Sequence, residues 1–292
     1  MVIVRLYGGL GNQLFQYAAG RAIAQRNGAT LGLDIADFAR DPKRSYRLHN
    51  LNTRGLIVPR RVSVCLRDPS LRRLVRCAPF FARHQLLPVR HEYLIEPHFN
   101  FDPRLQAATG NVCLDGYWQS ERYFSEVAPL LRQEFSARNA PDPTNEAMGR
   151  LIGDSESVSV HVRRGDYVSE AHTNRYHGTC TLDYYRRAIE TLCQEVERPH
   201  FFLFSDDMDW TSQHLRLDFP ATYVTHNGVD REHEDLRLMS QCKHHIIANS
   251  SFSWWGAWLA TNSGKIVIAP ARWFDEAPLD TRDLLPPSWR RM

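Results

Sequence analysis

Several features that are common in proteins are missing from this sequence of 292 residues. No segment reaches the roughly 18 uninterrupted apolar residues that a membrane span requires. The start, MVIVRLYGGLG, lacks the cationic end, apolar centre and cleavage site of a signal peptide. Internal repeats and low-complexity tracts are absent as well. With 43% hydrophobic and 24% charged residues, the composition therefore predicts a globular, cytoplasmic protein.

The cysteines and the net charge also exclude some classes. The cysteines lie at positions 65, 77, 113, 180, 193 and 242, and none forms a CxxC pair. A chain of this length builds a core without disulfides, so we interpret them as reduced thiols. The net charge of +3 is too small to indicate nucleic acid as a partner.

The positive charge is unevenly distributed. Nine arginines and one acidic residue, Asp68, lie between Arg54 and Arg90, which predicts a cationic face in the first half of the chain. Within this segment the apolar residues of Leu71 to Ala78 share one helical face and the arginines lie outside it. Two interpretations remain open: an ordinary surface helix, or a helix that rests on anionic lipid at the inner face of a membrane.

The order of apolar segments predicts two domains, 1–140 and 141–292, joined within the proline-rich segment 136–147. In the first half we expect strands at 2–6 and 31–35 around a helix at 12–27. Prolines interrupt the pattern between 40 and 110. In the second half we expect strands at 157–162, 201–204, 222–226, 244–248 and 265–270 and helices at 182–196, 232–242 and 251–260. This alternation predicts an α/β fold with a doubly wound parallel sheet, which binds ligands beyond the carboxyl ends of its strands.

Cationic side chains follow the apolar strand in SVHVRRGDYV, residues 159 to 168. Because side chains alternate along a strand, His161 and Arg163 share one face and Arg164 points to the other. A guanidinium donates two parallel hydrogen bonds to phosphate oxygens, so this strand end is a candidate anion site. The alternative is a structural ion pair with Asp166 beside a histidine whose hydrogen bonds are satisfied within the protein.

Two further loops are candidates for anion or donor binding. In IIANSSFSWWGAW (246–258) a strand gives way to a helix, and the free N–H groups at its start can hold a phosphate, unless Asn249, Ser250 or Ser251 only caps the helix. In YGGLGNQLFQYAAG (7–20) a GxGxxG fingerprint fails at its third glycine, where Leu14 stands. What remains is a tight turn that brings its backbone and Asn12 near a ligand bound between the domains.

Several acidic and aromatic residues each allow a structural and a functional interpretation. Asp207 and Asp209 form a DxD, which either holds a metal between diphosphate oxygens or caps a helix. Asp235 is either an exposed helix acid or a carboxylate that accepts two hydrogen bonds from guanine. The tryptophans Trp254, Trp255 and Trp258, at helical spacing, belong either to the core or to a sugar-binding platform.

Taken together, the stretches GGLGNQLFQYAAG, HVRRGD, FSDD and DLRLMSQCKHHIIANSSFSWWGAWLA resemble the bacterial α-1,2-fucosyltransferases, in the same order over residues 7 to 273. The resemblance implies two facing Rossmann-like domains of the GT-B type, the second binding GDP-L-fucose and the first mainly the acceptor. It implies that Arg163 contacts the β-phosphate, His161 the nucleotide and Asp235 the guanine. The remaining donor-binding residues that it implies are Gly11 and Asn12 in the first domain and Ser250, Ser251 and Phe252 at the helix start.

The resemblance further implies an inverting transfer of fucose to the 2-hydroxyl of a terminal β-galactoside, on a glycan or a lipid-linked oligosaccharide, without a metal. The candidate catalytic residues are Arg163, Asn12 and, as general base, His177. The alternatives are a metal-dependent sugar transferase that uses Asp207 and Asp209, and a noncatalytic glycan-binding protein that uses Trp254 and Trp258.

Overall fold

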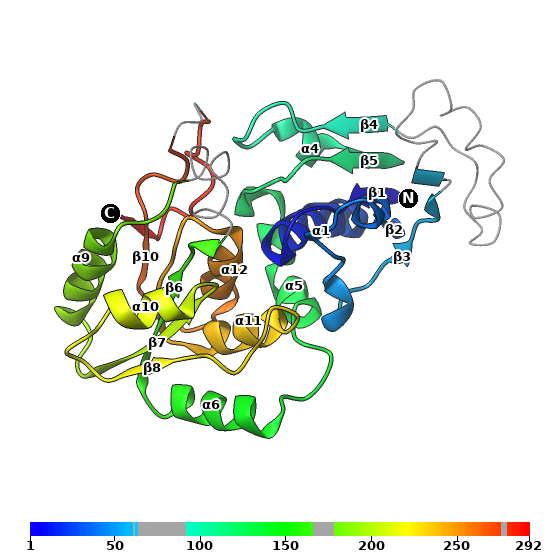
Figure 1. Ribbon diagram of the computed structural model, residues 1–292. Coiled ribbons are helices and arrows are strands. Elements are labelled where there is room, and N and C mark those ends of the chain that lie inside the picture. The colour runs from blue at the N-terminus through cyan, green and yellow to red at the C-terminus, as the bar shows by residue number, and fades with distance from the viewer. Residues whose placement is uncertain (61, 64–91, 166–177, 276–278) are drawn as a thin grey trace. The chain divides into compact units, whose positions relative to one another are not determined.

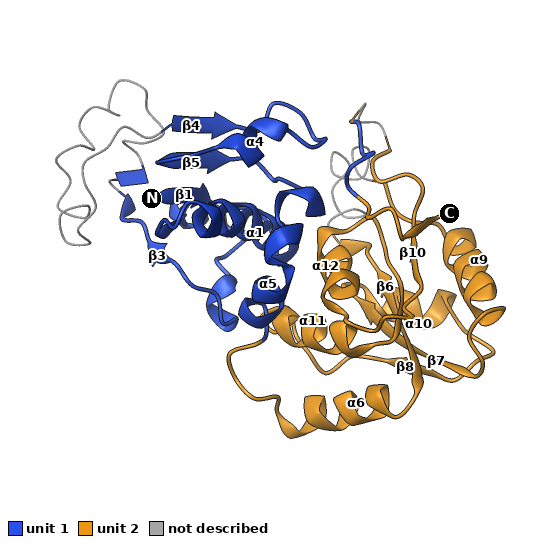
Figure 2. Ribbon diagram, turned by 180° about the vertical axis from the view of Figure 1, so that it is seen from behind, with its two compact units in different colours: residues 1–136, 280–284 blue, residues 137–279, 285–292 orange. Residues whose placement is uncertain are grey.

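The computed structural model describes residues 1–60, 62–63, 92–165, 178–275 and 279–292 (Figure 1). The chain divides into two compact units, coloured separately in Figure 2: Met1–Ser136 with Asp280–Leu284, and Ala137–Leu279 with Leu285–Met292. The division after Ser136 falls inside the proline-rich segment 136–147. The segment Asp280–Leu284, which the division at 140 assigned to the second domain, groups instead with the first unit.

The first unit is built on a five-stranded parallel sheet in the order β3-β2-β1-β5-β4. The strands are β1 (Val2–Arg5), β2 (Leu31–Asp34), β3 (Leu56–Ile57), β4 (Glu92–Ile95) and β5 (Val112–Asp115). Helix α1 (Leu10–Arg26) connects β1 to β2 and packs closely on them, because a Cβ at Gly20 would lie 3.1 Å from Val4 and 3.2 Å from Leu31. The strands predicted at 2–6 and 31–35 and the helix predicted at 12–27 are confirmed.

Short helices complete the first unit. They are η1 (Ala36–Ala39), η2 (Leu48–Asn50), α4 (Pro103–Ala107), η4 (Glu121–Tyr123), η5 (Ser125–Val127) and α5 (Ala128–Glu134). The late segment Asp280–Leu284 is held here through Asp283. Its carboxylate accepts a hydrogen bond from the Phe101 N–H at 3.1 Å and pairs with Arg122 at 2.7 Å. A residue near the end of the chain thus stabilises loops of the first unit.

The second unit is built on a six-stranded parallel sheet in the order β11-β10-β9-β6-β7-β8. Its strands are β6 (Glu156–Val162), β7 (Pro199–Ser205), β8 (Ala221–Tyr223), β9 (His244–Ile246), β10 (Val267–Ala269) and β11 (Arg290–Arg291). Its helices are α6 (Pro143–Gly153), α9 (Leu182–Cys193), α10 (Met208–His214), α11 (Glu232–Gln241) and α12 (Ser251–Leu259). All five strands and three helices predicted for this half are confirmed, whereas α6, α10 and β11 were not predicted.

Both faces of the second sheet are covered by helices, as Figure 1 shows. Val158, Val160 and Val162 on β6 pack against residues of α9, including Tyr185 and Leu192. On the other face, Phe202 and Phe204 of β7 pack against α6 and α11. The doubly wound parallel sheet expected from the sequence is therefore present, with β6 at its centre.

The tryptophans of α12 lie in the core of the second unit. Trp254 and Trp255 are completely buried and Trp258 is 5% exposed. The core interpretation is confirmed, and the sugar-platform hypothesis for Trp254 and Trp258 is wrong because their rings do not reach solvent. This removes the feature on which the noncatalytic glycan-binding alternative depended.

Across the part of the chain that the structure describes, no helix has the length and apolar character needed to cross a membrane. The arginine-rich stretch from Leu71 to Ala78 lies outside the described residues. Its contact with lipid therefore stays a prediction.

Candidate functional site

The carboxyl end of β6 lies where the strand order of the second sheet reverses. From β6 the chain proceeds to β7 and β8 on one side, and later to β9, β10 and β11 on the other. Loops leave such a reversal in opposite directions, and the crevice between them is where α/β sheets bind ligands. The two loops here are the one after β6, which carries Arg163 to Gly165, and the one after β9, which leads into α12.

His161, near the end of β6, contacts the start of α12. Its ring centroid lies 5.6 Å from that of Phe252 in the first turn of α12. The side chain is 4% exposed, and Nδ1 has no hydrogen-bond partner among the described residues. Burial lowers the pKa of His161 to about 4, so the imidazole is neutral at neutral pH. The ring therefore adds no positive charge to that of Arg163.

Arg163 is oriented by an aspartate on the neighbouring strand. The register pairs Val162 with Ser205, so the next residues, Arg163 and Asp206, lie side by side at the sheet edge. Nη1 of Arg163 is 2.8 Å from Oδ2 of Asp206, whose Oδ1 accepts the Arg164 N–H at 2.8 Å. Arg163 therefore has a structural ion pair with Asp206, and the predicted pair with Asp166 is not tested. Asp166 lies outside the described residues.

Arg164 points away from Arg163 and has a structural role. Its guanidinium lies 3.6 Å from the ring centroid of Trp210 and 3.4 Å from Asp207. Asp207 is also the N-cap of α10, accepting the Trp210 N–H at 3.2 Å. The capping interpretation of Asp207 is confirmed. Among the residues described, no group of three or more histidine, cysteine or acidic side chains is arranged to hold a metal ion.

The start of α12 is capped by Ser250. Its hydroxyl accepts the Phe252 N–H at 3.3 Å. Asn249 does not cap the helix, because its Nδ2 donates to the carbonyls of Gly178 and Trp273, both at 3.2 Å. Asn249 thus ties the helix start to two other loops, a positioning role that the sequence did not reveal. Ser251 and Phe252 remain partly exposed in the first turn, beside His161.

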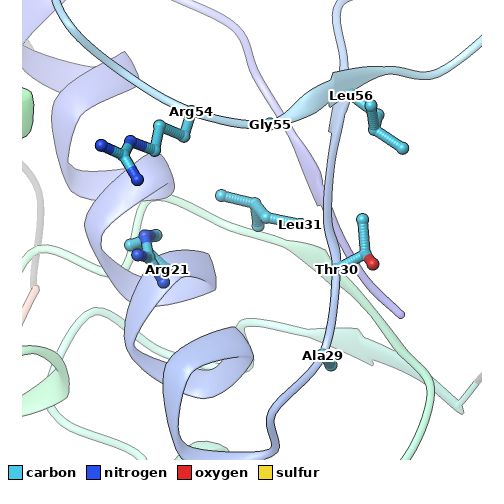
Figure 3. Close-up of a pocket in the computed structure, with 7 residues that line it drawn as sticks. All are labelled: Arg21, Ala29, Thr30, Leu31, Arg54, Gly55 and Leu56. Carbon is cyan, nitrogen blue, oxygen red and sulfur yellow. The ribbon is translucent and has the colours of Figure 1, made fainter.

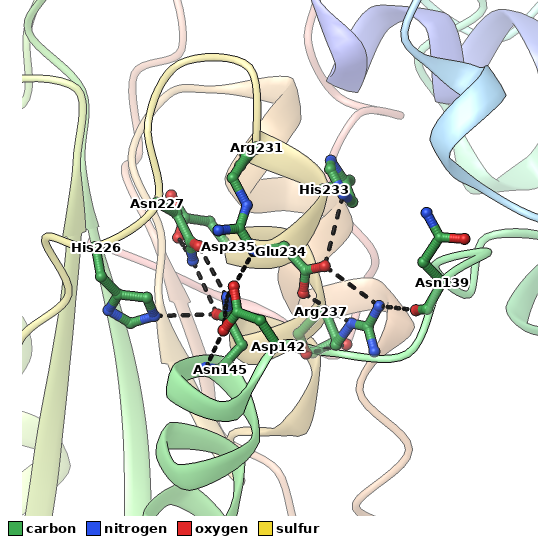
Figure 4. Close-up of polar contacts among 11 residues, drawn as sticks. Asn139, Asp142, Asn145, His226, Asn227, Arg231, His233, Glu234, Asp235 and Arg237 are labelled. Carbon is green, nitrogen blue, oxygen red and sulfur yellow. Dashed lines mark hydrogen bonds and ion pairs between the residues drawn. The ribbon is translucent and has the colours of Figure 1, made fainter.

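Asp235 belongs to a polar network on α11 and the loops around it (Figure 4). It is mostly buried, so the description as an exposed helix acid is wrong, and burial raises its pKa to about 7. Oδ1 accepts a hydrogen bond from Nδ2 of Asn227 at 2.8 Å, and Asn227 in turn donates to Asn145 at 3.0 Å. Asp142, the N-cap of α6, pairs with Arg231 next to them.

The sequence did not indicate these partners. Asp142 and Asn145 fall in the proline-rich segment, which its composition identified only as a connection between domains. The only available signal was the DPTN pattern, a typical helix start with an aspartate before proline.

In the first unit, the loop after β1 places Gly11 and Asn12 in the first turn of α1. Gly8 adopts a φ of +76° here, where its lack of a side chain also leaves room for Asn12. Oδ1 of Asn12 accepts a hydrogen bond from Nε2 of Gln119 at 3.0 Å, which fixes the orientation of the carboxamide. Gly11 is buried beneath it. The other candidate catalytic residue, His177, lies outside the described residues.

A pocket of about 290 Å³ in the first unit lies at the opposite edge of its sheet, at the amino-terminal ends of β2 and β3 (Figure 3). It is lined by Arg21, Ala29, Thr30, Leu31, Arg54, Gly55 and Leu56. Arg21 is already paired with the buried Glu134 at 3.0 Å. Because ligands of parallel sheets bind beyond the carboxyl ends, we do not assign the candidate site to this pocket.

Comparison with known proteins agrees with the fold and the sequence pattern. Over residues 76–291 the chain matches the model of glycosyl transferase family 11. It is 36% identical over 295 residues to an alpha-1,2-colitosyltransferase from Escherichia coli, covering 100% of this chain and 99% of that protein. It is 27% identical over 263 residues to galactoside alpha-(1,2)-fucosyltransferase 1 from Rattus norvegicus, covering 87% of this chain and 62% of that protein.

Among solved structures, the fucosyltransferase NodZ from Bradyrhizobium superposes with a TM-score of 0.53 at 17% identity, covering 87% of this chain and 91% of that one. This likeness and the two parallel sheets confirm the predicted α/β fold of the GT-B type. The family match over most of the chain, together with the full-length likeness to one of its relatives, shows that this protein is a glycosyltransferase of family 11.

Proposed function

We propose that this glycosyltransferase transfers L-fucose from GDP-L-fucose, with inversion, to the 2-hydroxyl of a terminal β-galactoside. The observation that carries the proposal is the junction of β6 and α12, where Arg163, His161 and the Ser250 helix start meet at one strand-order reversal. Two anion-binding features predicted separately from the sequence thus belong to one place. The α-(1,2)-fucosyltransferase relative supports the same linkage.

The donor's diphosphate is assigned to this junction. In an inverting transfer the acceptor hydroxyl attacks C1 of the sugar as the bond to the β-phosphate breaks, so negative charge grows on that phosphate. Arg163 and the first turn of α12, at the positive end of that helix, are the groups that would stabilise it. We propose that no metal takes part, since Asp207, the first carboxylate of the DxD, is engaged by Trp210 and Arg164.

Asp235 is proposed to bind the guanine. A carboxylate accepts two hydrogen bonds from the N1–H and 2-amino group of guanine, which adenine does not offer. The two donors would stabilise the ionised form of Asp235, whose pKa is raised to about 7 by burial in the free protein. Asn227 holds one carboxylate oxygen at 2.8 Å and so fixes the direction of the other.

Two roles remain proposals from the sequence. Asn12, held by Gln119 at 3.0 Å, is assigned to the fucosyl group of the donor together with Gly11. His177 is the candidate general base for the acceptor hydroxyl. An active His177→Ala variant would remove the second assignment.

A second candidate is transfer of colitose from its GDP-activated form, which the 36% identity to an alpha-1,2-colitosyltransferase over the whole chain favours. Colitose is fucose without the 3-hydroxyl. A site that hydrogen-bonds this hydroxyl would reject colitose strongly, because its polar groups would be left unpaired. The relative rates with the two donors therefore distinguish the candidates.

The test is a product assay in which the purified chain receives lactose and either GDP-fucose or GDP-colitose, with the linkage determined by NMR. We expect a Fuc-α-(1,2)-Gal product and a higher kcat/KM for GDP-fucose. A higher kcat/KM for GDP-colitose would establish the second candidate. Transfer from neither donor, under conditions in which GDP binds, would refute both.

A further inference from the structure

The sheet of the first unit also has a reversal of strand order, and polar side chains gather there. From β1 the chain builds β2 and β3 on one side, while β5 and β4 lie on the other, so the order reverses between β1 and β5. Arg5 ends β1 and Asp115 ends β5, so both lie at the carboxyl edge of the sheet. Parallel sheets bind ligands beyond the carboxyl ends of the strands at a reversal of strand order, so a ligand site is expected here as it is at β6.

Arg5 is held rigidly at this reversal. Its Nη1 lies 2.9 Å from both carboxylate oxygens of Asp115, and its Nε lies 2.6 Å from Oδ2 of Asp37. The Tyr93 hydroxyl donates to Asp115 at 2.8 Å. The side chains of Arg5, Asp37 and Asp115 are 32%, 23% and 16% exposed, so they still reach solvent. The result is a fixed, partly exposed array of hydrogen-bonding groups.

Two tyrosines adjoin this array. Tyr7 follows β1 and Tyr117 follows β5, and their rings meet edge to face with centroids 5.0 Å apart. The Arg5 guanidinium lies 5.1 Å from the centre of the Tyr7 ring. Tyr117 is 37% exposed, so part of its ring surface faces solvent. An apolar surface therefore borders the polar groups.

Glu96, the residue after β4, positions Tyr117. Its two carboxylate oxygens accept the N–H groups of Tyr117 at 2.7 Å and Trp118 at 2.9 Å. Trp118 has a φ of +56°, a strained conformation for a residue with a side chain. The carboxylate thus holds a turn that would not form by itself, and this turn presents Tyr117 to solvent.

The charges of this cluster decide which class of ligand fits. One guanidinium, that of Arg5, faces the carboxylates of Asp37 and Asp115, and Glu96 adds a third carboxyl group, whose pKa burial raises to about 7. With one positive charge and at least two negative ones the cluster is negative overall, which disfavours a phosphate or a nucleotide. Carboxylates and a guanidinium beside exposed aromatic surface instead suit a neutral molecule with several hydroxyls and an apolar face, as in a sugar ring.

We propose that Arg5, Tyr7, Asp37, Asp115 and Tyr117 form a binding site for a neutral saccharide at the carboxyl edge of the first unit's sheet. Its identification as the galactoside acceptor rests on the proposed function. The carboxylates of Asp37 and Asp115 accept hydrogen bonds from sugar hydroxyls, Arg5 donates to the sugar oxygens, and Tyr117 covers the apolar face of the ring.

The experiment measures binding of lactose and of GDP to the full chain by NMR titration and calorimetry. Tyr117→Ala removes the exposed ring, and Asp37→Asn replaces an ionised acceptor while keeping its size. Tyr117→Phe keeps the ring and loses only the hydroxyl. Ile57→Ala removes an apolar side chain of similar exposure, 45%, from β3 in the same unit. Melting temperatures show that each variant is folded.

We expect Tyr117→Ala to weaken lactose binding on the order of five-fold, the loss typical of an aromatic contact. Asp37→Asn should weaken it on the order of ten-fold, the loss of a hydrogen bond to a charged group. Tyr117→Phe, which keeps the ring, should bind lactose more tightly than Tyr117→Ala does. Ile57→Ala should bind lactose as the unchanged protein does, and GDP affinity should be the same in all variants.

Several results would overturn the site: lactose affinity unchanged in Tyr117→Ala and Asp37→Asn, no binding of lactose or N-acetyllactosamine by the unchanged protein, or a loss of GDP affinity in the two variants. Failure of the proposed function is a different result. If the variants weaken lactose binding but neither donor supports transfer, the saccharide site stands and the donor assignment falls. If transfer occurs and Tyr117→Ala leaves the KM for lactose unchanged, the donor assignment stands and the saccharide site falls.

Discussion

Gly165→Ala adds one methyl group next to the carboxylate that orients Arg163. A Cβ built on Gly165 would lie 2.5 Å from Oδ2 and 3.0 Å from Cγ of Asp206, whereas ordinary contact begins at 3.4 Å. The backbone itself tolerates alanine, since Gly165 is not among the glycines with positive φ. The carboxylate must therefore retreat by about 0.9 Å, the difference between 3.4 and 2.5 Å.

This shift breaks the ion pair. A retreat of that size takes the Arg163–Asp206 distance from 2.8 Å to beyond hydrogen-bonding range. A hydrogen bond between charged groups contributes about 1.5–3 kcal/mol, and partial exposure of this pair reduces the expected loss to about 1–2 kcal/mol. If Asp206 holds Arg163 against the leaving phosphate, kcat/KM falls about 5- to 30-fold, since about 1.4 kcal/mol is a factor of ten.

The assay is transfer from GDP-fucose to lactose, compared with Gly153→Ala, where an added Cβ meets nothing within 4 Å. A double-mutant cycle with Asp206→Ala shows whether the added methyl group acts through Asp206. If the methyl group acts by displacing Asp206, it costs nothing once that carboxylate is absent. Turnover of Gly165→Ala within about two-fold of the unchanged enzyme, or an undiminished effect in the Asp206→Ala background, would refute the reasoning.

The other predictions concern the donor, the metal and pH. Arg163→Lys keeps the charge and loses the guanidinium fork, so turnover should fall at least about 100-fold; near-normal turnover contradicts the phosphate assignment. Asp235→Asn should weaken GDP binding about 10- to 100-fold by calorimetry and erase the preference for GDP over ADP; an unchanged preference removes Asp235 from guanine recognition. Activity should persist in EDTA, and its loss would revive the metal-dependent alternative. Burial raises the pKa of Glu96 from 4.5 to about 7, so the folded state holds this proton more tightly than the unfolded chain. As the pH rises from about 4.5 to 7, the free energy of unfolding should therefore fall relative to that of Glu96→Gln. Urea titrations of both proteins across this pH range test this, and free energies that change in parallel would contradict it.

The strands that the sequence indicated most clearly are those buried on both faces. VIVRL, SVSVHV and FFLF are apolar runs because parallel strands are covered by helices on both faces. Helix α6 was missed because it begins at Pro143, inside the proline-rich segment 136–147, whose composition indicated only a connection between domains. The presence of α10 was implied only by the capping interpretation of Asp207, and no bounds were predicted because Thr211 alone of its seven residues is buried.

The candidate site was predicted in part. The cationic strand end was recognisable because an apolar strand has no need of His161 and Arg163. Its partner was not, since Asp206 comes to Arg163 only through the register of β6 and β7, which the sequence does not encode locally. For the same reason the contacts of Asp235 with Asn227, and of Asn227 with Asn145, became visible only in the fold.

The return of Asp280–Leu284 to the first unit has a consequence for engineering. A fragment that stops at Ser136 lacks Asp283, and with it the acceptor for the Phe101 N–H and the counter-ion of Arg122. Chimeras that exchange the first unit between relatives should therefore transplant two separate stretches of the chain. A single crossover at the linker would combine Asp280–Leu284 of one relative with the first unit of the other.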